Sequence, residues 1–165
     1  MRKQVIGLAV VALAFFPLLA HGQSKPVLVV HAFSVGSTVA WPYDGKQLQT
    51  QTVAELKAKP LAQFDVVAEA PSNATAHVYT LDGEVLSWQA GNRAKRLVVG
   101  LGSGRETSEI RYRLTDEKGS KIFEHKDTIR AEFIGNAYAG SVGQLAHPFA
   151  SKIADRLNDV KLTVR

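Results

Sequence analysis

The chain of 165 residues contains no cysteine. This absence excludes disulfide bonds, thiolate metal sites, cysteine nucleophiles and a lipid anchor attached to an amino-terminal cysteine. Proline is scarce, at 6 residues, and the 13 glycines follow no period, which excludes a collagen-like structure. With 45 % hydrophobic and 21 % charged residues, the composition is that of a globular protein whose stability depends on a hydrophobic core.

The chain also lacks a strongly basic segment. Its 20 Lys and Arg residues against 15 Asp and Glu give a formal net charge of +5. The positive residues are dispersed among acidic ones, and no basic run contains the interleaved aromatic side chains that stack on nucleic acid. We therefore expect a mixed, solvated surface and no nucleic-acid partner.

One long hydrophobic run is present, at the amino terminus. Arg2 and Lys3 precede apolar residues 5–20, and Ala20-His21-Gly22 has the small-x-small pattern of a signal peptidase site. The run is about 16 residues long, shorter than the roughly 20 that span a membrane. We predict a cleaved signal peptide over residues 1–22 and a periplasmic or secreted protein over residues 23–165. Retention of the segment as a membrane anchor is the alternative.

The first half of residues 23–165 alternates strands and a helix. Residues 27–35 form a short β-branched run that predicts one buried strand. Asp44 and Gln47 have the spacing of a capping box, and Leu48 and Leu56 belong to an apolar stripe, so a helix should run from there to Pro60. Residues 64–68 predict a second short strand.

The second half favours antiparallel strands. Residues 77–88 should pair in a hairpin with residues 95–101, and Asp82-Gly83 should be a glycine bulge inside the first arm. Residues 110–115 predict a further strand with one buried and one solvent-exposed face. A turn at Lys118-Gly119 should lead into a strand over residues 122–133.

The carboxy-terminal segment predicts an amphipathic helix. Leu145, Phe149, Ile153 and Leu157 recur every four residues, so they form one apolar stripe that should pack on a sheet, and Pro148 should start or kink the helix. The predicted fold is therefore α/β of the α+β type. It is a single domain in which two main helices pack on a mixed, largely antiparallel sheet of about five strands.

The central residues resemble a known family. Residues 81–85, residues 89–104 and the alternating strand that ends at Asp116 are similar to a bacterial exported family called domain of unknown function 4410. The resemblance is sharpest over residues 81–116. It implies a small α/β domain of the cell envelope, and it implies no catalytic residues.

Three features are candidate binding sites. Gly100, Gly102 and Gly104 could let backbone amides approach a phosphate, although a strand follows them instead of the helix that a dinucleotide site needs, so a bulged turn is favoured. Trp41 and Tyr43 flank Pro42 in a loop and either pack on the domain or contact a partner. Residues 135–143, which include Tyr138, form a loop that a partner could order.

Patterns for catalysis and metal binding are missing. No His-Glu-x-x-His pattern and no Gly-x-Ser-x-Gly elbow occurs, and Asp82 and Glu84, which should share one strand face, are interpreted as exposed strand charges. We expect no enzyme, no cofactor and no metal site. The expected function is a binding or assembly accessory of the bacterial envelope with a protein partner. The alternative is a small-molecule or nucleotide-binding module that uses the glycine loop near Gly102.

The amino-terminal segment gives a direct prediction. Sequencing the amino terminus of the mature protein should begin at or near Gln23, because signal peptidase cleaves after a small residue. A mature chain that still contains Leu8 would contradict cleavage.

Overall fold

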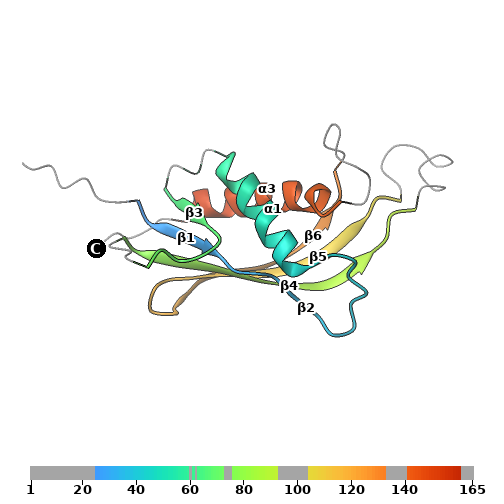
Figure 1. Ribbon diagram of the computed structural model, residues 1–165, viewed down its shortest axis with the longest axis horizontal. Coiled ribbons are helices and arrows are strands. Elements are labelled where there is room, and N and C mark those ends of the chain that lie inside the picture. The colour runs from blue at the N-terminus through green and yellow to red at the C-terminus, as the bar shows by residue number, and fades with distance from the viewer. Residues whose placement is uncertain are drawn as a thin grey trace, which may run out of the picture.

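The computed structural model describes residues 25–59, 61, 63–72, 76–92, 104–132 and 141–160. The predicted signal peptide lies outside this range. One six-stranded mixed sheet is present, and both helices lie over the same face of it (Figure 1). In chain order, the elements are β1 (Val27–Val30), β2 (Ser34–Val35), α1 (Gly45–Lys57), β3 (Asp65–Val67), β4 (Val78–Gln89), β5 (Thr107–Thr115), β6 (Lys121–Arg130) and α3 (Gly143–Asp159).

The sheet has the order β3-β1-β4-β5-β6, and β2 pairs with β4 beyond the end of β1. The two long pairs, β4 with β5 and β5 with β6, are antiparallel. The short pairs of β1 with β3 and of β1 and β2 with β4 are parallel. The predicted fold class is therefore confirmed: two helices pack on a mixed sheet in a single domain.

The single strand predicted over residues 27–35 is wrong, because the chain leaves the edge of β4 between β1 and β2. Phe33 turns inward and is only 4 % exposed, and its backbone N–H donates to the carbonyl of Gly45. A Cβ at Gly83 would collide with the Phe33 ring. The absence of a side chain at Gly83 therefore makes room for the ring, and pairing with β4 resumes at β2.

The prediction for β4 is partly corrected. The strand continues through Asp82-Gly83, but the register irregularity lies between Val85 and Ser87 and not at Gly83. The described antiparallel partner of β4 is β5, which pairs with residues 80–89, and the predicted partner, residues 95–101, lies outside the described residues. β5 has an alternating pattern in which Ile110, Tyr112 and Leu114 are all buried on the helix side of the sheet.

Both predicted helices are confirmed. Asp44 accepts a hydrogen bond from the backbone N–H of Lys46, and the Gln47 side chain accepts one from the backbone of Asp44, so the capping box forms as predicted. In α3, Pro148 lies inside the helix and does not start it. The predicted apolar stripe of α3 is fully buried, at 0–1 % exposure: Leu145, Phe149, Ile153 and Leu157.

Phe149 lies at the centre of the core between sheet and helices. Its ring makes edge-to-face contacts with Phe33, at 5.5 Å between ring centroids, and with Tyr112, at 5.3 Å. It therefore joins the segment before α1, strand β5 and helix α3 in one aromatic cluster.

Replacing Phe149 by Ala should lower the free energy of unfolding by about 3–5 kcal/mol, because the substitution leaves a cavity in a fully buried cluster. Urea denaturation measures the change. Asp155→Ala on the exposed side of the same helix is the control and should cost about 0.5 kcal/mol or less. Similar losses in both variants would refute the core assignment of Phe149.

Candidate functional site

Three connections of the chain meet at one end of the sheet, which we call the loop end. The last residue of β4, the first of β5 and the last of β6 are neighbours there, since Gln89 pairs with Thr107 and Thr107 with Arg130. The start of α1 and the start of α3 also lie towards this end (Figure 1). The described residues that meet there are 36–44, 90–92, 104–106, 131–132 and 141–142.

The buried carboxylate of Glu106 joins these segments. Glu106 is 5 % exposed, and its Oε1 accepts a hydrogen bond from the Trp88 indole at 2.7 Å. Its Oε2 accepts one from the Tyr43 hydroxyl at 3.2 Å, and its backbone carbonyl accepts one from the N–H of Ala131 at 2.8 Å. One residue therefore contacts the loop before α1, the end of β4 and the segment after β6.

Glu106 is buried without an ion-pair partner among the described residues. Burying a carboxylate in this way is costly unless donors replace the lost water, and Tyr43 and Trp88 supply two such donors. Burial, with the nearby charge of Glu106, raises the pKa of the Tyr43 hydroxyl well above its usual value near 10, so the hydroxyl stays a donor.

Trp41 packs against the same cluster. Its ring lies 5.2 Å from that of Tyr43 in an edge-to-face arrangement at 79°, and both rings pack on the hydrophobic core. The Trp41 indole N–H is buried and has no hydrogen-bond partner in the described part of the chain. The structure therefore shows Trp41 and Tyr43 packed on the domain, which is one of the two interpretations of this pair.

A cavity of about 560 Å³ opens beside Tyr43, between the start of α1 and the residues before α3. Its walls carry mainly neutral hydrogen-bonding side chains from α1. The lining residues are Tyr43, Asp44, Lys46, Gln47, Thr50, Gln51, Ser141 and Val142. Its volume lies within the range of small-molecule sites.

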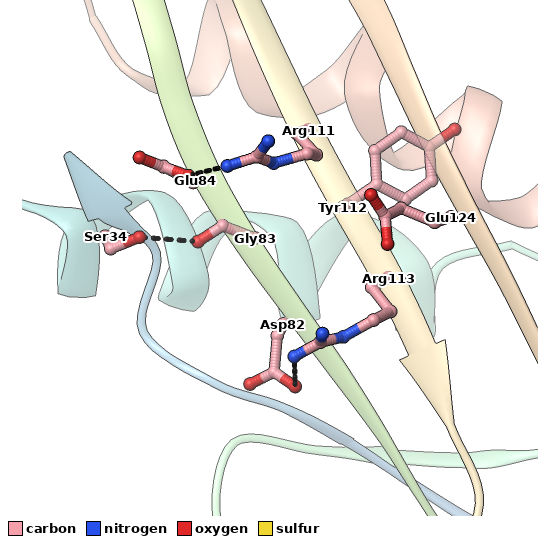
Figure 2. A pocket seen from close by; sticks show the side chains of 8 residues that line it. All are labelled: Ser34, Asp82, Gly83, Glu84, Arg111, Tyr112, Arg113 and Glu124. Atoms are coloured by element: carbon pink, nitrogen blue, oxygen red, sulfur yellow. Dashed lines mark hydrogen bonds and ion pairs between the residues drawn. The ribbon is translucent and has the colours of Figure 1, made fainter. Parts of the chain in front are cut away.

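A second hollow, of about 260 Å³, lies on the sheet face opposite the helices (Figure 2). Asp82 and Glu84 of β4 share this face, as predicted, and meet arginines of β5. Arg111 forms an ion pair with Glu84, and Arg113 lies 4.0 Å from Asp82. These exposed pairs contribute about 0–1 kcal/mol each, so the hollow is a charged surface on which carboxylates and guanidiniums balance.

The structure places some of the predicted site residues and not others. Trp41 and Tyr43 lie at the loop end, as does Gly104, whose φ of 73° is in the left-handed region and whose carbonyl accepts a hydrogen bond from Asn92. Gly100, Gly102 and Tyr138 lie outside the described residues. The glycine-loop site therefore stays a prediction.

Sequence reasoning missed Glu106 and Trp88. Glu106 could have been found, because the buried alternation of Ser108, Ile110 and Tyr112 extends back by two residues to position 106. Trp88 could not, because the irregularity between Val85 and Ser87 shifts its side chain to the helix side of β4.

Comparison with known proteins identifies the family. The family model described as "Domain of unknown function (DUF4410)" matches residues 42–138. The chain belongs to this family. The match includes Tyr43, Trp88 and Glu106, so the hydrogen bonds that join the loop end lie within the family domain. No curated protein is detectably similar to the chain.

Solved structures share the fold at low sequence identity. A structure described as the PelC dodecamer from Paraburkholderia phytofirmans is 18 % identical, with a TM-score of 0.50 over 85 % of this chain and 91 % of that one. An uncharacterised protein is 16 % identical, with a TM-score of 0.52 over 82 % of this chain and 92 % of that one. At these identities the likeness concerns the fold alone.

Two further properties concern the helices and the possible metal ligands among the described residues. None of the helices in the described ranges is long and apolar enough to cross a membrane. Those ranges also contain no group of three His, Asp or Glu side chains placed to hold a metal ion.

Removing the Glu106 carboxylate should destabilise the protein strongly. Glu106→Ala leaves the partly buried donors of Tyr43 and Trp88 without their acceptor, so the free energy of unfolding should fall by about 2–3 kcal/mol. Glu109→Ala on the open face of β5 removes only an exposed ion pair with Lys126 and should cost about 1 kcal/mol or less. Denaturant unfolding of both variants measures the difference, and equal losses would contradict the role given to Glu106.

The buried Tyr112 and the partly buried Tyr43 predict a loss of stability in alkali. Burial, helped by Asp127, also raises the pKa of Tyr112, whose hydroxyl donates to that carboxylate at 2.7 Å. Above about pH 10 an unfolded tyrosine loses its proton, whereas folded Tyr43 and Tyr112 keep theirs. The unfolded state then binds fewer protons, so the free energy of unfolding falls as the pH rises further, and the contribution is fully present below pH 10.

The measurement is urea denaturation from pH 8 to pH 12. The double variant Tyr43→Phe/Tyr112→Phe should start from a lower stability and lose less of it between pH 10 and pH 12 than the unchanged protein. Parallel pH profiles for the two proteins would show that these hydroxyls do not titrate with unfolding.

Proposed function

We propose that this protein is a non-enzymatic, exported protein of the bacterial cell envelope that acts as a binding or assembly accessory through its loop end. The observation that carries the proposal is the buried Glu106, which holds three separate connections of the chain against one another. Loops that a rigid scaffold positions at one end of a sheet are a common arrangement for recognition.

The amino-terminal sequence supports an envelope location. Arg2 and Lys3, the apolar residues 5–20 and the small-x-small site at residues 20–22 are the parts of an export signal. Membership of the DUF4410 family is compatible with this location, since the resemblance on residues 81–116 implies an exported family.

The charged side chains support binding over catalysis. The carboxylates of Asp82 and Glu84 are engaged by arginines across the sheet, and the Glu106 carboxylate is engaged by two buried donors. Each of these three acids therefore takes part in a structural contact. The pKa values of Tyr43 and Tyr112 are raised, away from the pH range in which their hydroxyls could exchange protons. An assembly role is also in keeping with the fold, because PelC, which shares it, is described as a dodecamer.

Small-molecule binding is the second candidate, and the cavity beside Tyr43 favours it. The amides of Gln47 and Gln51 and the hydroxyls of Thr50 and Ser141 line this cavity. They could orient a polar ligand. Among the described residues, this cavity offers room for such a ligand, and the glycine loop near Gly102 lies outside those residues.

Site-specific photo-crosslinking in the native host tests the proposal. A photoreactive amino acid replaces Lys46, which is exposed at the cavity, or Lys118, which is exposed in the hairpin at the opposite end of β5. We expect position 46 to form a discrete adduct with an envelope protein and position 118 to form none. Fractionation of the same cells should recover the protein outside the cytoplasm.

Three results would count against the proposal. Recovery in the cytoplasm would overturn the envelope location. Adducts from position 118 alone would move the recognition surface to the other end of the sheet. Binding of a purified small molecule that shifts the melting temperature, with no protein adduct, would favour the second candidate.

A further inference from the structure

Strand β6 presents a long backbone edge. It is the last strand in the sheet order and has 10 residues, and the described residues place no strand beside its outer edge. The unused N–H and C=O groups of such an edge can bond to another strand. Proteins usually discourage this pairing with charged residues along the edge, so the arrangement of the charges decides what the edge can accept.

The charges of β6 are arranged symmetrically about His125. Glu124 and Lys126 flank it and are exposed on the sheet face away from the helices. Their ion-pair partners among the described residues are not buried: Glu124 lies 3.6 Å from the exposed Lys121, and Lys126 lies 2.9 Å from the half-buried Glu109. A facing strand can therefore contact both side chains without uncovering a buried charge.

We infer that β6 pairs with β6 of a second copy of this chain, antiparallel and centred on His125. In this register Glu124 faces the partner's Lys126, and Lys126 faces the partner's Glu124, so the two-fold symmetry creates two attractive cross-strand pairs. Residues 123–127, which lie in the regular stretch of β6, all find a partner in the facing strand. Ile122, which is 36 % exposed, lies next to this stretch, at the irregularity in the pairing of β6 with β5.

Neighbouring registers are less favourable. Centring the pair on residue 126 places Lys126 against the partner's Lys126, and centring it on residue 124 places two glutamates together. Centring it on residue 127 brings two Asp127 carboxylates into opposition on the helix side. Like charges directly opposite one another destabilise a strand pair, so these three registers are disfavoured against the one centred on His125, in which the charges of β6 complement those of a second copy.

Charge reversal provides a test that separates this surface from any other. Full chains carrying Glu124→Lys or Lys126→Glu place like charges opposite one another in the homodimer. Each should raise the dimer dissociation constant about tenfold or more, because two attractive pairs become repulsive. An equimolar mixture of the two variants restores both attractive pairs in the heterodimer, and so does the double variant Glu124→Lys/Lys126→Glu in its own dimer.

Analytical ultracentrifugation over a concentration series measures the association, and circular dichroism and melting temperature verify that each variant folds. Glu109→Gln is the matched control, since it removes the intrachain partner of Lys126 and leaves the proposed contact in place. We expect the unchanged protein, the control, the mixture and the double variant to dimerise and each single variant to be weakened.

Other outcomes overturn the inference. An unchanged protein that stays monomeric at about 100 µM, far above the dissociation constants of specific dimers, excludes the pairing. Single variants that associate as well as the unchanged protein assign self-association to another surface. Weakened single variants whose mixture fails to associate exclude the register centred on His125. The envelope function proposed above is tested in cells through position 46, so either proposal can fail without the other.

Discussion

The arrangement of the loop end depends on one buried carboxylate. Glu106 reaches the helix side of the sheet four residues before the alternating pattern of β5 becomes apolar at Ile110, and there it is 5 % exposed. A charge in this position must be compensated by hydrogen bonds, and its donors, Tyr43 and Trp88, lie far from it in the sequence. The requirement to satisfy Glu106 therefore fixes where the loop before α1 lies relative to the end of β4.

A second constraint acts at Phe33, near the start of the segment that connects β1 to α1. Phe33 leaves the path of β1 to join Phe149 and Tyr112 in the core, and the space it occupies exists because Gly83 has no side chain. The segment from β1 to α1 is thus held by an aromatic ring at one end and by Tyr43 at the other. Between these two contacts lies the short strand β2, and after them α1 begins with the cavity on its first turns.

Local patterns predicted the elements well, and long-range contacts account for what they missed. The capping box at Asp44, the stripe from Leu145 to Leu157 and the alternation along β5 involve residues near one another in the sequence, so the sequence alone revealed them. The break at Phe33 depends on Gly83, fifty residues later, and the burial of Trp88 depends on an irregularity in the pairing with β5. Trp41 and Tyr43 are evident in the sequence as loop aromatics, but Glu106, which positions Tyr43, lies directly before β5 and outside the strand predicted over residues 110–115. Side chains brought together from separate segments leave no periodic signal in either segment.

Hydrogen–deuterium exchange on Glu106→Ala tests the central claim most directly, because it reports on each segment of the loop end separately. If the Glu106 carboxylate holds the loop before α1 through Tyr43, amides of residues 39–46 should exchange faster in the variant, whereas the N–H of Ala131, which bonds to the backbone carbonyl of residue 106, should keep its protection. The hairpin amides of Gly119 and Ser120, at the opposite end of β5, should keep the protection that their bonds to Asp116 provide. Unchanged exchange in residues 39–46 would contradict the account.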